Sequence, residues 1–466
     1  MAPNPPSTAT AFNTLPIELN QIIAHQLDTD KDIASFRSIC HSTNDAIDAD
    51  NFSFWRARFQ SKFAFREGST NKELRKTYQR RSKQLRRGTG YDFFRGHKKR
   101  EKDVLLVLQE LIIESFRGPI EVDEHGRSWC KNLQLLLNFG LGSKILLNNR
   151  RAPPPGRGEP SQVDSLLAAV KLMCSHFLFQ LEGAQHNVFA VEESQRVVYM
   201  ATNSAPLYGG DNFTQVNMEW MLHCMHFFRH HMMNDEVATL FDAMDQLTPK
   251  QKPSAWQVPL HKGTHALGSH WKGTYAFLDV HEVVKLRKLP ADEIGDHYFC
   301  DKNVDEGKIQ SLELDFVEGA QLRWPDIFEK RLHSLRNTVV PQPTAQGRGK
   351  PKIDPTQKNI QFTGTGVDLD DDFNAIGWLN PLPDQCGIPG WQRITFMKHF
   401  MDDFDQTDQD NLWAYEGVVL PGGRVILGRW WYASENVNFS DDYNGPFILW
   451  AVDEPDIFDD ESDGEH

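Results

Sequence analysis

The sequence predicts an α+β protein that begins with a three-helix module, continues through a helical middle region and ends in a closed antiparallel β-barrel. Between residues 15 and 55, large apolar side chains recur at the three- and four-residue spacing of amphipathic helices. From Gly263 onward, short runs rich in Gly, Trp and Tyr are separated by turn residues, which is typical of strands. Many short strands in one region favour a closed barrel, because closure removes unpaired sheet edges.

The first module begins at Leu15 and Pro16. Proline is favoured in the first turn of a helix, where its missing N–H costs no hydrogen bond. A module of about forty-five residues buries too little of its surface to enclose this many large side chains, so an apolar face is left over as a docking site. Two apolar stripes and a closing aromatic pair make up this surplus: Leu19, Ile22, Ile23 and Leu27; Ile33, Phe36, Ile39 and Cys40; Phe54 and Trp55.

This segment resembles the F-box, the motif by which substrate receptors dock onto the Skp adaptor of cullin-RING ubiquitin ligases. One departure is Thr43, which stands where family members often carry Trp. The alternative is an ordinary helical subdomain that packs on its own chain. The resemblance implies that residues 12–60 bind the adaptor through Leu15, Pro16, Ile17, Leu19, Ile22, Ile23, Leu27, Ile33, Phe36, Ile39, Cys40 and Trp55.

The composition is that of a soluble globular protein of two or three domains, with 466 residues, 39% hydrophobic and 24% charged. No apolar run approaches the roughly 18 residues of a membrane span. Residues 1–11 are rich in Pro, Ser and Thr and lack the pattern of a secretory signal, so we expect a disordered lead. The six cysteines include no CxxC pair, which indicates reduced thiols in the cytoplasm, the nucleus or both.

The net charge of −14 is unevenly distributed. Residues 56–102 contain seventeen Lys or Arg and four acids, whereas residues 453–466 contain eight acids and no Lys or Arg. We expect a basic helical linker over residues 61–102 and a disordered acidic tail over residues 453–466. Nucleic-acid binding by the basic segment is the alternative, but between Lys72 and Arg87 only Tyr78 could stack on a base.

A helical domain is expected over residues 103–260, interrupted by a Pro-rich surface loop from Arg150 to Gln162. Apolar side chains at helical spacing predict five helices in and around this region: Val104–Phe116, Leu133–Leu147, Val163–Leu181, Trp220–Met233 and Glu236–Leu247.

The barrel is expected over residues 261–452, with a mobile basic insertion at 341–358. Pro421-Gly422-Gly423 predicts a hairpin turn. The candidate strands are His270–Leu278, Val280–Arg287, Ile309–Phe316, Ile360–Gly364, Asp372–Leu379, Trp391–His399, Leu412–Leu420, Val425–Tyr432 and Phe447–Val452.

The segments Gly268–Tyr275 and Leu427–Trp430 look like the two ends of a lipocalin-like barrel. The strings Phe362–Asp368, Trp413–Gly417 and Gly445–Phe447 look like fungal F-box proteins that carry such a barrel. The resemblance implies that Trp271 packs under Arg429 in a cation–π contact. Rim loops and the mouth of such barrels bind ligands, so the candidate substrate-binding residues are Trp413, Tyr415, Arg429, Trp430 and Tyr443.

Two groups of residues contain the residue types of metal sites but lack the ligand spacing or the number of ligands that such sites require. The acidic run from Asp301 to Gly307 places its glycine at position seven, whereas an EF-hand loop requires glycine at position six. His223, His226 and His230 share one face of a predicted helix, but no fourth ligand is evident. We expect a polar hairpin turn and packed histidines, with calcium and zinc as alternatives and no cofactor.

The sequence shows no catalytic arrangement, because it lacks the Gly-x-Ser-x-Gly nucleophile elbow. Gly364-Thr365-Gly366 lacks the Lys and Ser or Thr of a phosphate loop and predicts a turn or bulge. The F-box resemblance implies a non-catalytic substrate receptor of a Skp–cullin–F-box ubiquitin ligase, which binds the Skp adaptor and through it a cullin, and holds a target protein in the barrel. The alternatives are a barrel that binds a small apolar molecule and a nucleic-acid-associated protein.

Overall fold

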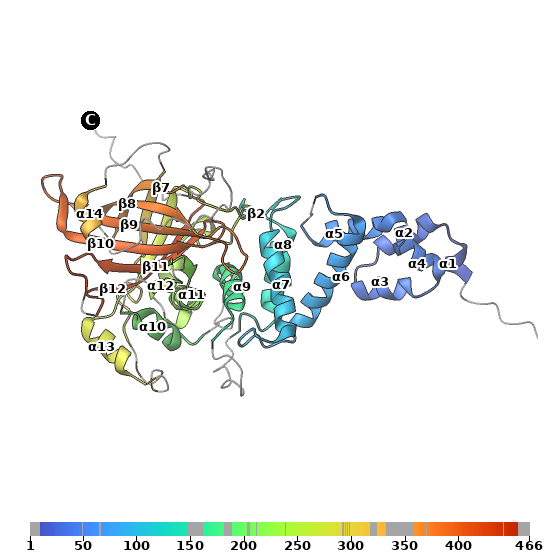
Figure 1. Ribbon diagram of the computed structural model, residues 1–466, viewed down its shortest axis with the longest axis horizontal. Helices are drawn as coiled ribbons and strands as arrows, with labels where there is room; N and C mark the ends of the chain where they lie inside the picture. Colours follow the sequence, from blue (N-terminus) through green and yellow to red (C-terminus); the bar gives the residue numbers. More distant parts are fainter. Residues whose placement is uncertain are drawn as a thin grey trace, which may run out of the picture. The chain divides into compact units, whose positions relative to one another are not determined.

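A computed structural model shows a mixed α+β protein whose C-terminal part is a closed eight-stranded barrel (Figure 1). It describes residues 10–454 except 49, 65–66, 148–161, 181–188, 203–205, 211, 238, 291–292, 294, 296, 298, 317–323, 332–357, 370 and 441. Of the ends expected to be disordered, 1–11 and 453–466, residues 1–9 and 455–466 lie outside the described residues, whereas residues 10 and 11 belong to a helix. Nearly all of the expected mobile insertion at 341–358 also lies outside the described residues. Two compact units separate: Met1–Tyr91 with Lys99–Gly142, and Asp92–Lys98 with Ser143–His466. The residues expected to form one helical domain, 103–260, are divided between these units.

The first unit begins with short helices where the sequence predicts three longer ones. Asn51 and Phe52 have positive φ angles of 49° and 62°, and this left-handed turn separates the last two of these helices. The Thr29 hydroxyl caps the third helix by accepting a hydrogen bond from the Asp32 N–H at 3.1 Å. The helices are α1 (Thr10–Thr14), α2 (Ile17–His25), α3 (Asp30–Arg37), α4 (His41–Asp48) and α5 (Ser53–Lys62), with a 3₁₀ turn at Asp50–Phe52.

The rest of the first unit is a set of longer helices and one small hairpin. Thr70 and Glu73 form a capping box at the start of α6 (Asn71–Gly88). At the other end of α6, a Cβ on Gly88 would lie 2.8 Å from Val104 and 2.9 Å from Phe139, so only glycine allows this close packing. Val104 belongs to α7 (Lys99–Ile113) and Phe139 to α8 (Lys131–Gly142), which are joined through β1 (Glu121–Val122) and β2 (Ser128–Trp129).

The barrel in the second unit has the simplest closed topology, in which each strand pairs antiparallel with the next along the chain. The last strand returns to pair with the first, through Phe447 opposite Tyr275 and Ala451 opposite Trp271. Eight of the nine predicted strands are therefore present. They are β5 (His270–Tyr275), β6 (Gln310–Asp315), β7 (Ile360–Asp368), β8 (Asp371–Pro381), β9 (Gln392–Met401), β10 (Thr407–Val419), β11 (Val425–Tyr432) and β12 (Asn444–Ala451).

The ninth prediction, a strand at Val280–Arg287, is wrong. This segment is helix α13 (Val280–Lys288) within the long connection from β5 to β6. Its buried residues are Val283 and Leu286, three positions apart, and Lys285, Arg287 and Lys288 stand in the last turn, where cations are favourable. The run of β-branched residues suggested a strand, but the period of the buried positions is helical.

Two glycines that suggested a turn lie instead inside β7. A Cβ on Gly364 would lie 2.8 Å from the Glu313 carbonyl oxygen. A Cβ on Gly366 would overlap the Ser311 carbonyl oxygen and lie 2.5 Å from the Phe373 ring. These glycines mark a close approach between strands rather than a turn. The predicted hairpin turn at Pro421-Gly422-Gly423 is confirmed, with the Leu420 N–H bonded to the Val425 carbonyl at 2.9 Å.

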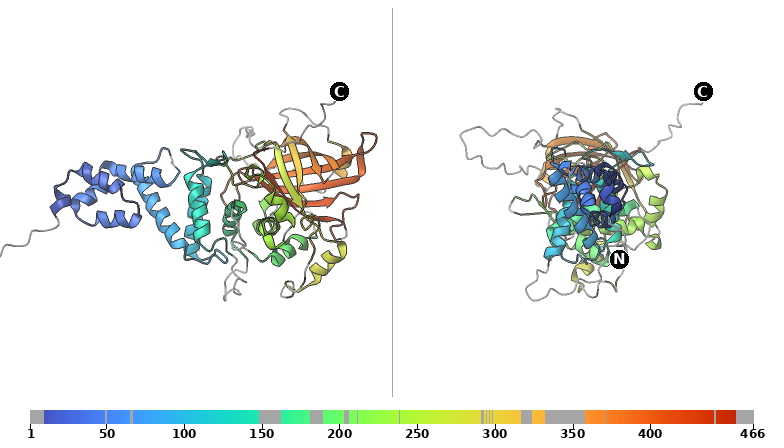
Figure 2. Two further views of the ribbon diagram at one scale, coloured as in Figure 1. Left: turned by 180° about the vertical axis from the view of Figure 1, so that it is seen from behind. Right: turned by 90° about the vertical axis from the view of Figure 1, so that its right-hand side faces the viewer.

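Helices of the second unit cover part of the outer wall of the barrel, as seen from both sides in Figures 1 and 2. The Tyr208 hydroxyl donates to the Gly417 carbonyl of β10 at 2.8 Å, and its ring lies 4.5 Å from the Arg393 guanidinium. Arg393 pairs with Glu416 on this wall, and both are buried. The elements of this unit outside the barrel, besides α13, are α9 (Ser165–Ser175), a 3₁₀ turn at His176–Gln180, α10 (Val191–Met200), β3 (Tyr208–Gly209), β4 (Gln215–Val216), α11 (Met218–Met233), 3₁₀ turns at Asp235–Val237 and Pro249–Gln251, α12 (Thr239–Asp245) and α14 (Asp326–Arg331). Of these, α10 and α11 contact β11 or β12, and Phe328 of α14 packs against Met397 and Leu412.

Candidate functional site

The open end of the barrel carries a cavity built from inward-facing side chains near the strand ends. This end holds the last residues of β5, β7, β9 and β11 and the first residues of β6, β8, β10 and β12. The cavity has a volume of about 390 Å³. The residues that line it, here called the barrel mouth, are Tyr275, Phe277, Asp368, Leu369, Asp371, Lys398, Phe400, Asn411, Trp413, Tyr415, Trp430 and Tyr443.

A buried ion pair lies among these aromatic walls. The Lys398 ammonium donates to Asp368 Oδ2, which also accepts a hydrogen bond from the Tyr275 hydroxyl at 3.1 Å. Lys398 Nζ lies 4.1 Å from the centroid of the Phe373 ring, within range of a cation–π contact. Burial lowers the pKa of Lys398, and the Asp368 carboxylate partly offsets this shift. The mouth therefore combines apolar walls with one internally compensated pair of charges.

Trp430 is the central residue of the aromatic wall. Its ring centroid lies 5.4 Å from Trp413, 5.2 Å from Tyr275 and 6.0 Å from Phe277, all in edge-to-face geometry. Its Nε1–H donates to the Ala276 carbonyl oxygen at 3.2 Å. Interlocked rings of this kind hold one another in place, so the wall is preformed.

Beyond the mouth, the interior of the barrel is filled by side chains. The rings of Phe396 and Tyr415 stack with centroids 4.6 Å apart, and Phe447 packs edge-on against Tyr415 at 5.0 Å. Toward the other end, Trp271, Leu314, Leu379, Val419 and Ile426 belong to the same buried cluster. A ligand can enter the mouth, but this cluster blocks passage through the barrel.

Four of the five residues predicted to bind substrate line the barrel mouth: Trp413, Tyr415, Trp430 and Tyr443. Arg429 does not, because neighbouring residues of a strand point to opposite faces and Trp430 points inward. The Arg429 guanidinium donates to Asn444 Oδ1 at 2.6 Å and to the Ala201 carbonyl at 2.9 Å on the outer wall. Burial lowers the pKa of Arg429 to about 9.

The predicted cation–π contact between Trp271 and Arg429 is therefore wrong. Trp271 belongs to the cluster inside the barrel, and its Nε1–H donates to the Gly268 carbonyl at 2.7 Å. Arg429 instead lies 4.4 Å from the Phe439 ring on the outer wall. The two residues lie on opposite faces of the sheet.

Sequence reasoning missed Lys398, Asp368 and Phe400 as residues of the mouth. A signal was present in β9, where Ile394, Phe396, Lys398 and Phe400 alternate along the strand. Ile394 and Phe396 point into the core, so the period of two places Lys398 inside as well. A charged residue in the inward register of a barrel strand marks a polar site inside the barrel.

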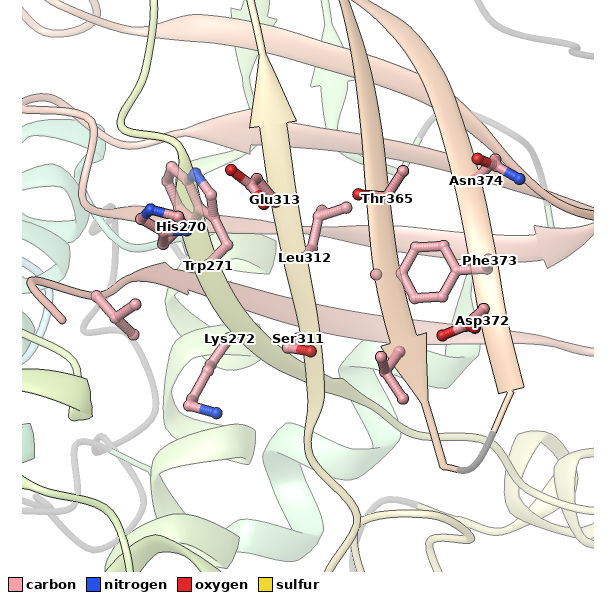
Figure 3. Close-up of a pocket in the computed structure, with 13 residues that line it drawn as sticks. His270, Trp271, Lys272, Ser311, Leu312, Glu313, Thr365, Asp372, Phe373 and Asn374 are labelled. Carbon is pink, nitrogen blue, oxygen red and sulfur yellow. The ribbon is translucent and has the colours of Figure 1, made fainter. Parts of the chain in front are cut away.

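A second hollow lies on the outer wall of the barrel, over β5, β6, β7 and β8 (Figure 3). Its volume is about 460 Å³. The strands lie side by side, and the outward-facing side chains on them are mainly polar: His270, Lys272, Ser311, Glu313, Thr365, Asp372 and Asn374. Trp271, Leu312 and Phe373, which belong to the inward-facing cluster, also line this hollow.

The twelve residues predicted to bind the adaptor divide into a surface set and a core set. Leu19 and Ile22 on α2 are 44% and 56% exposed, and Pro16, Ile17 and Ile39 are exposed as well. Leu15, Ile23, Leu27 and Cys40 are partly buried. Ile33, Phe36 and Trp55 are buried in the module itself, so they hold it together and offer little surface to a partner.

The exposed stripe on α2 follows from its helical period. Asn20 and Ala24, four residues apart, form the buried face of the helix, which packs against α4. Asn20 Nδ2 donates to the Phe12 carbonyl at 3.0 Å and to Ser42 Oγ at 3.1 Å. Ile22 lies on the opposite side of the helix, and Leu19 and Ile23 lie between the two sides, Leu19 exposed and Ile23 partly buried. We call these three residues the α2 stripe.

Thr43 stands at the position where the F-box family often carries Trp, and it is buried. Its Oγ1 accepts a hydrogen bond from the Cys40 N–H at 3.1 Å and donates to the Cys40 carbonyl at 2.9 Å. Trp55 packs with Tyr78 at 5.6 Å, and its Nε1–H donates to Asp48 at 3.1 Å. The threonine therefore anchors the start of α4 through two local hydrogen bonds, with its side chain fully buried.

No family model, no curated protein and no solved structure matches the chain. The F-box and lipocalin resemblances therefore rest on the residues quoted for them, and the eight-stranded barrel rests on the structure. Within the described part of the chain, no helix has both the length and the apolar composition needed to cross a bilayer.

His223 and His226 of α11 each contact a serine on a neighbouring helix and do not converge on a common site. His223 Nδ1 contacts Ser194 Oγ at 3.2 Å, and burial lowers the pKa of His223 to about 3. His226 Nε2 contacts Ser175 Oγ at 3.4 Å, and burial lowers its pKa as well. Within the described ranges, no group of three or more His, Cys, Asp or Glu side chains could hold a metal ion. A pKa this low makes His223 a weak base toward the Ser194 hydroxyl.

The acidic run from Asp301 to Gly307 is a compact turn before β6, bonded to the helices beside the barrel. Asp301 is buried and accepts hydrogen bonds from Tyr199 at 2.9 Å and Gln195 at 2.6 Å. His231 lies 3.4 Å from both Asp301 and Asp305. These contacts give Asp301 and Asp305 a structural role that needs no calcium ion.

Proposed function

We propose that this protein is the substrate-recognition subunit of a Skp–cullin–F-box ubiquitin ligase. Its N-terminal helices would bind the Skp adaptor, and its barrel mouth would hold a segment of a target protein. The observation that carries the proposal is the α2 stripe, because a small helical module with exposed Leu19 and Ile22 leaves apolar surface for a partner.

The proposed mechanism is proximity. Docking to the adaptor and its cullin would bring a bound target close to a charged ubiquitin-conjugating enzyme, and the effective concentration of the target lysine would rise. The chain would supply no catalytic side chain. Its contribution would be the affinity of the barrel mouth for the target and of the N-terminal helices for the adaptor.

The test is a pull-down of the purified full chain with the Skp adaptor. Ile22→Asp with Leu19→Asp places two charges on the exposed stripe without touching the core of the module, and we expect it to abolish adaptor binding. The matched control is Leu106→Asp on α7, which is also an exposed leucine on a helix of this unit and should bind like the wild type. Failure of the wild type to bind the adaptor would refute the proposal.

The Leu15→Ala with Pro16→Ala variant is a weaker probe. Pro16 precedes the first turn of α2, and its carbonyl accepts hydrogen bonds from the Leu19 and Asn20 N–H groups. Its replacement can loosen the helix as well as remove contact area. Loss of binding in this variant therefore needs a circular dichroism spectrum that matches the wild type.

A second candidate function is binding of a small apolar molecule. The cavity of about 390 Å³ with its preformed aromatic wall favours it, because such pockets are the usual sites of small ligands. Mass spectrometry of the purified, denatured protein tests it. A stoichiometric ligand that is lost in Trp430→Ala, together with no adaptor binding, would favour this function over the receptor role.

Nucleic-acid binding by the basic segment is the third alternative. Several of its cations pair with acids inside the same unit: Arg81 with Glu114 at 2.8 Å, Arg75 with Asp48 at 3.2 Å and Lys62 with Asp30 at 3.1 Å. Those cations already have counter-charges, which weakens the case for phosphate binding. Affinity for a duplex that falls steeply with salt would support this alternative.

A further inference from the structure

We propose that the barrel mouth recognises a peptide segment in which one aromatic side chain is flanked by lysine or arginine. The inference rests on the proposed function only for the view that the peptide belongs to a degradation target. The recognition itself follows from three features of the mouth: its aromatic cavity, its exposed apolar rim and its acidic hairpin.

The cavity fits a single large side chain rather than a folded surface. At about 390 Å³ it lies near the lower end of the range for ligand pockets, roughly 300–1,000 Å³. Trp413, Trp430 and Tyr275 offer edge-to-face partners, and an aromatic anchor buries about 150–250 Å² in such a site. The ion pair of Lys398 and Asp368 is already compensated, so the mouth needs no charged group on the anchor.

The rim shows that the occupant is larger than the cavity. Four exposed apolar side chains stand at or beside this end of the barrel: Leu369, Met401, Phe404 and Tyr443. Phe404 is 81% exposed at the tip of the hairpin between β9 and β10. A small molecule inside the cavity would leave Met401 and Phe404 in water, whereas a peptide that crosses the rim would cover them.

The charge of the rim sets the chemistry of the flanking residues. Residues 401–411, which form this hairpin, contain five Asp and no Lys or Arg. Asp402 accepts the Phe404 and Gln406 N–H groups at 2.9 Å and so shapes the turn, while Asp403 and Asp405 are exposed on either side of Phe404. Among the described residues that line the mouth, Asp368 and Asp371 outnumber the single cation, Lys398. A surface of this sign attracts Lys and Arg and repels acidic or phosphorylated segments.

The test measures binding of a fluorescein-labelled peptide to the full chain by anisotropy, with no adaptor present. The probe has the core Lys-Arg-Trp-Lys-Arg between Gly-Ser flanks. The two comparison peptides carry Ala in place of Trp, or Glu in place of every Lys and Arg. We expect each change to weaken binding about thirtyfold, the size of a hot-spot truncation. Binding of the probe should also fall as the Debye length shortens from about 30 Å at 0.01 M salt to about 8 Å at 0.15 M.

Variants of the chain place the binding at the mouth. Trp413→Ala should remove the preference for the Trp core, and Asp403→Lys with Asp405→Lys should remove the preference for the basic flanks. The matched control is Glu313→Lys with Asp315→Lys, which makes the same change of charge on exposed positions of β6 outside the mouth. If Trp413→Ala fails to fold, Tyr443→Ala on the exposed rim replaces it.

The outcomes separate this proposal from the receptor role. Equal binding of the three peptides, or a loss of binding in the β6 control, would overturn the proposed specificity of the mouth. Adaptor binding with no peptide preference would leave the receptor role standing and refute the substrate class. Peptide preference without adaptor binding would support the specificity of the mouth and refute the receptor role.

Discussion

Lys398 lines the barrel mouth, and burial of its charge there costs stability unless Asp368 pairs with it. Its ammonium is withdrawn from water, and Asp368, Gln310 Oε1 at 3.4 Å, the surrounding rings and the nearby charge of Asp371 compensate it. Breaking a buried ion pair by removing one partner costs more than removing both, because the remaining charge is left unpaired. The stability of the mouth should therefore depend on the pair rather than on either residue.

Lys398→Met should destabilise the protein by about 3–5 kcal/mol, since it leaves the Asp368 carboxylate buried without its cation. The double variant Lys398→Met with Asp368→Asn should recover most of this loss. Urea unfolding followed by tryptophan fluorescence measures both variants. Lys330→Met, which removes an exposed lysine on α14 of the same unit, is the control and should change little. A single variant as stable as the wild type would contradict the pairing.

A second single residue, His231, makes the stability of the protein depend on pH. Burial alone would lower its pKa, but the carboxylates of Asp301 and Asp305, each 3.4 Å from a ring nitrogen, raise it to about 9. The pKa in the folded state is thus above the ordinary value of 6.5. The contribution to stability is fully present below pH 6.5 and is lost as the pH rises through about 9.

The melting temperature of the wild type should therefore fall between pH 7 and pH 10 by more than that of His231→Gln, which has no proton to lose there. Differential scanning fluorimetry across this range measures the difference. Parallel pH profiles for the two proteins would show that the His231 cluster does not contribute.

At the scale of elements, side-chain size decides which strands can approach each other. β7 crosses β6 and β8 closely at Gly364 and Gly366, and the Phe373 ring fills the space beside Gly366. The barrel can bring these strands together only because two inward positions carry no Cβ.

Gly366→Ala should destabilise the barrel by about 1–3 kcal/mol, because the added methyl group overlaps β6 and the Phe373 ring. Gly268→Ala is the matched control, since nothing lies within 4 Å of its added Cβ. Chemical denaturation of both variants gives the comparison. Equal stability would mean that β7 can shift away from β6 without cost.

At the scale of the whole molecule, the chain has two compact units with separate cores. Ile33, Phe36 and Trp55 belong to the core of the first unit, whereas Phe396 and Phe447 belong to the barrel core. Units with their own cores can unfold as separate cooperative steps.

Calorimetry of the full chain should show two transitions. Ile33→Ala removes a buried side chain from the first unit and should lower one transition, since such a truncation costs about 2–5 kcal/mol. Gly366→Ala should lower the other. If either variant lowered both transitions equally, the two units would not be independent.

Local sequence patterns predicted most of the barrel strands and the longer helices of this protein. Short runs rich in Gly, Trp and Tyr between turn residues predicted β9, β10, β11 and β12, and Pro421-Gly422-Gly423 predicted the hairpin that the structure contains. The helical spacing near Leu133 and Trp220 predicted α8 and α11. These patterns succeed because they depend on local spacing, which the backbone imposes wherever the chain is.

Local patterns do not show which residues of distant strands meet, or which face of a strand points into the barrel. Arg429 lies on the outer wall and Lys398 in the mouth, because the pairing of all eight strands fixes which alternate residues of each strand face the interior. Val280–Lys288 became a helix within a long connection, although its β-branched residues suggested a strand. The mouth gathers residues from Tyr275 to Tyr443, and no local pattern shows that strands so far apart in the chain end at the same rim. Closure of the barrel brings them together.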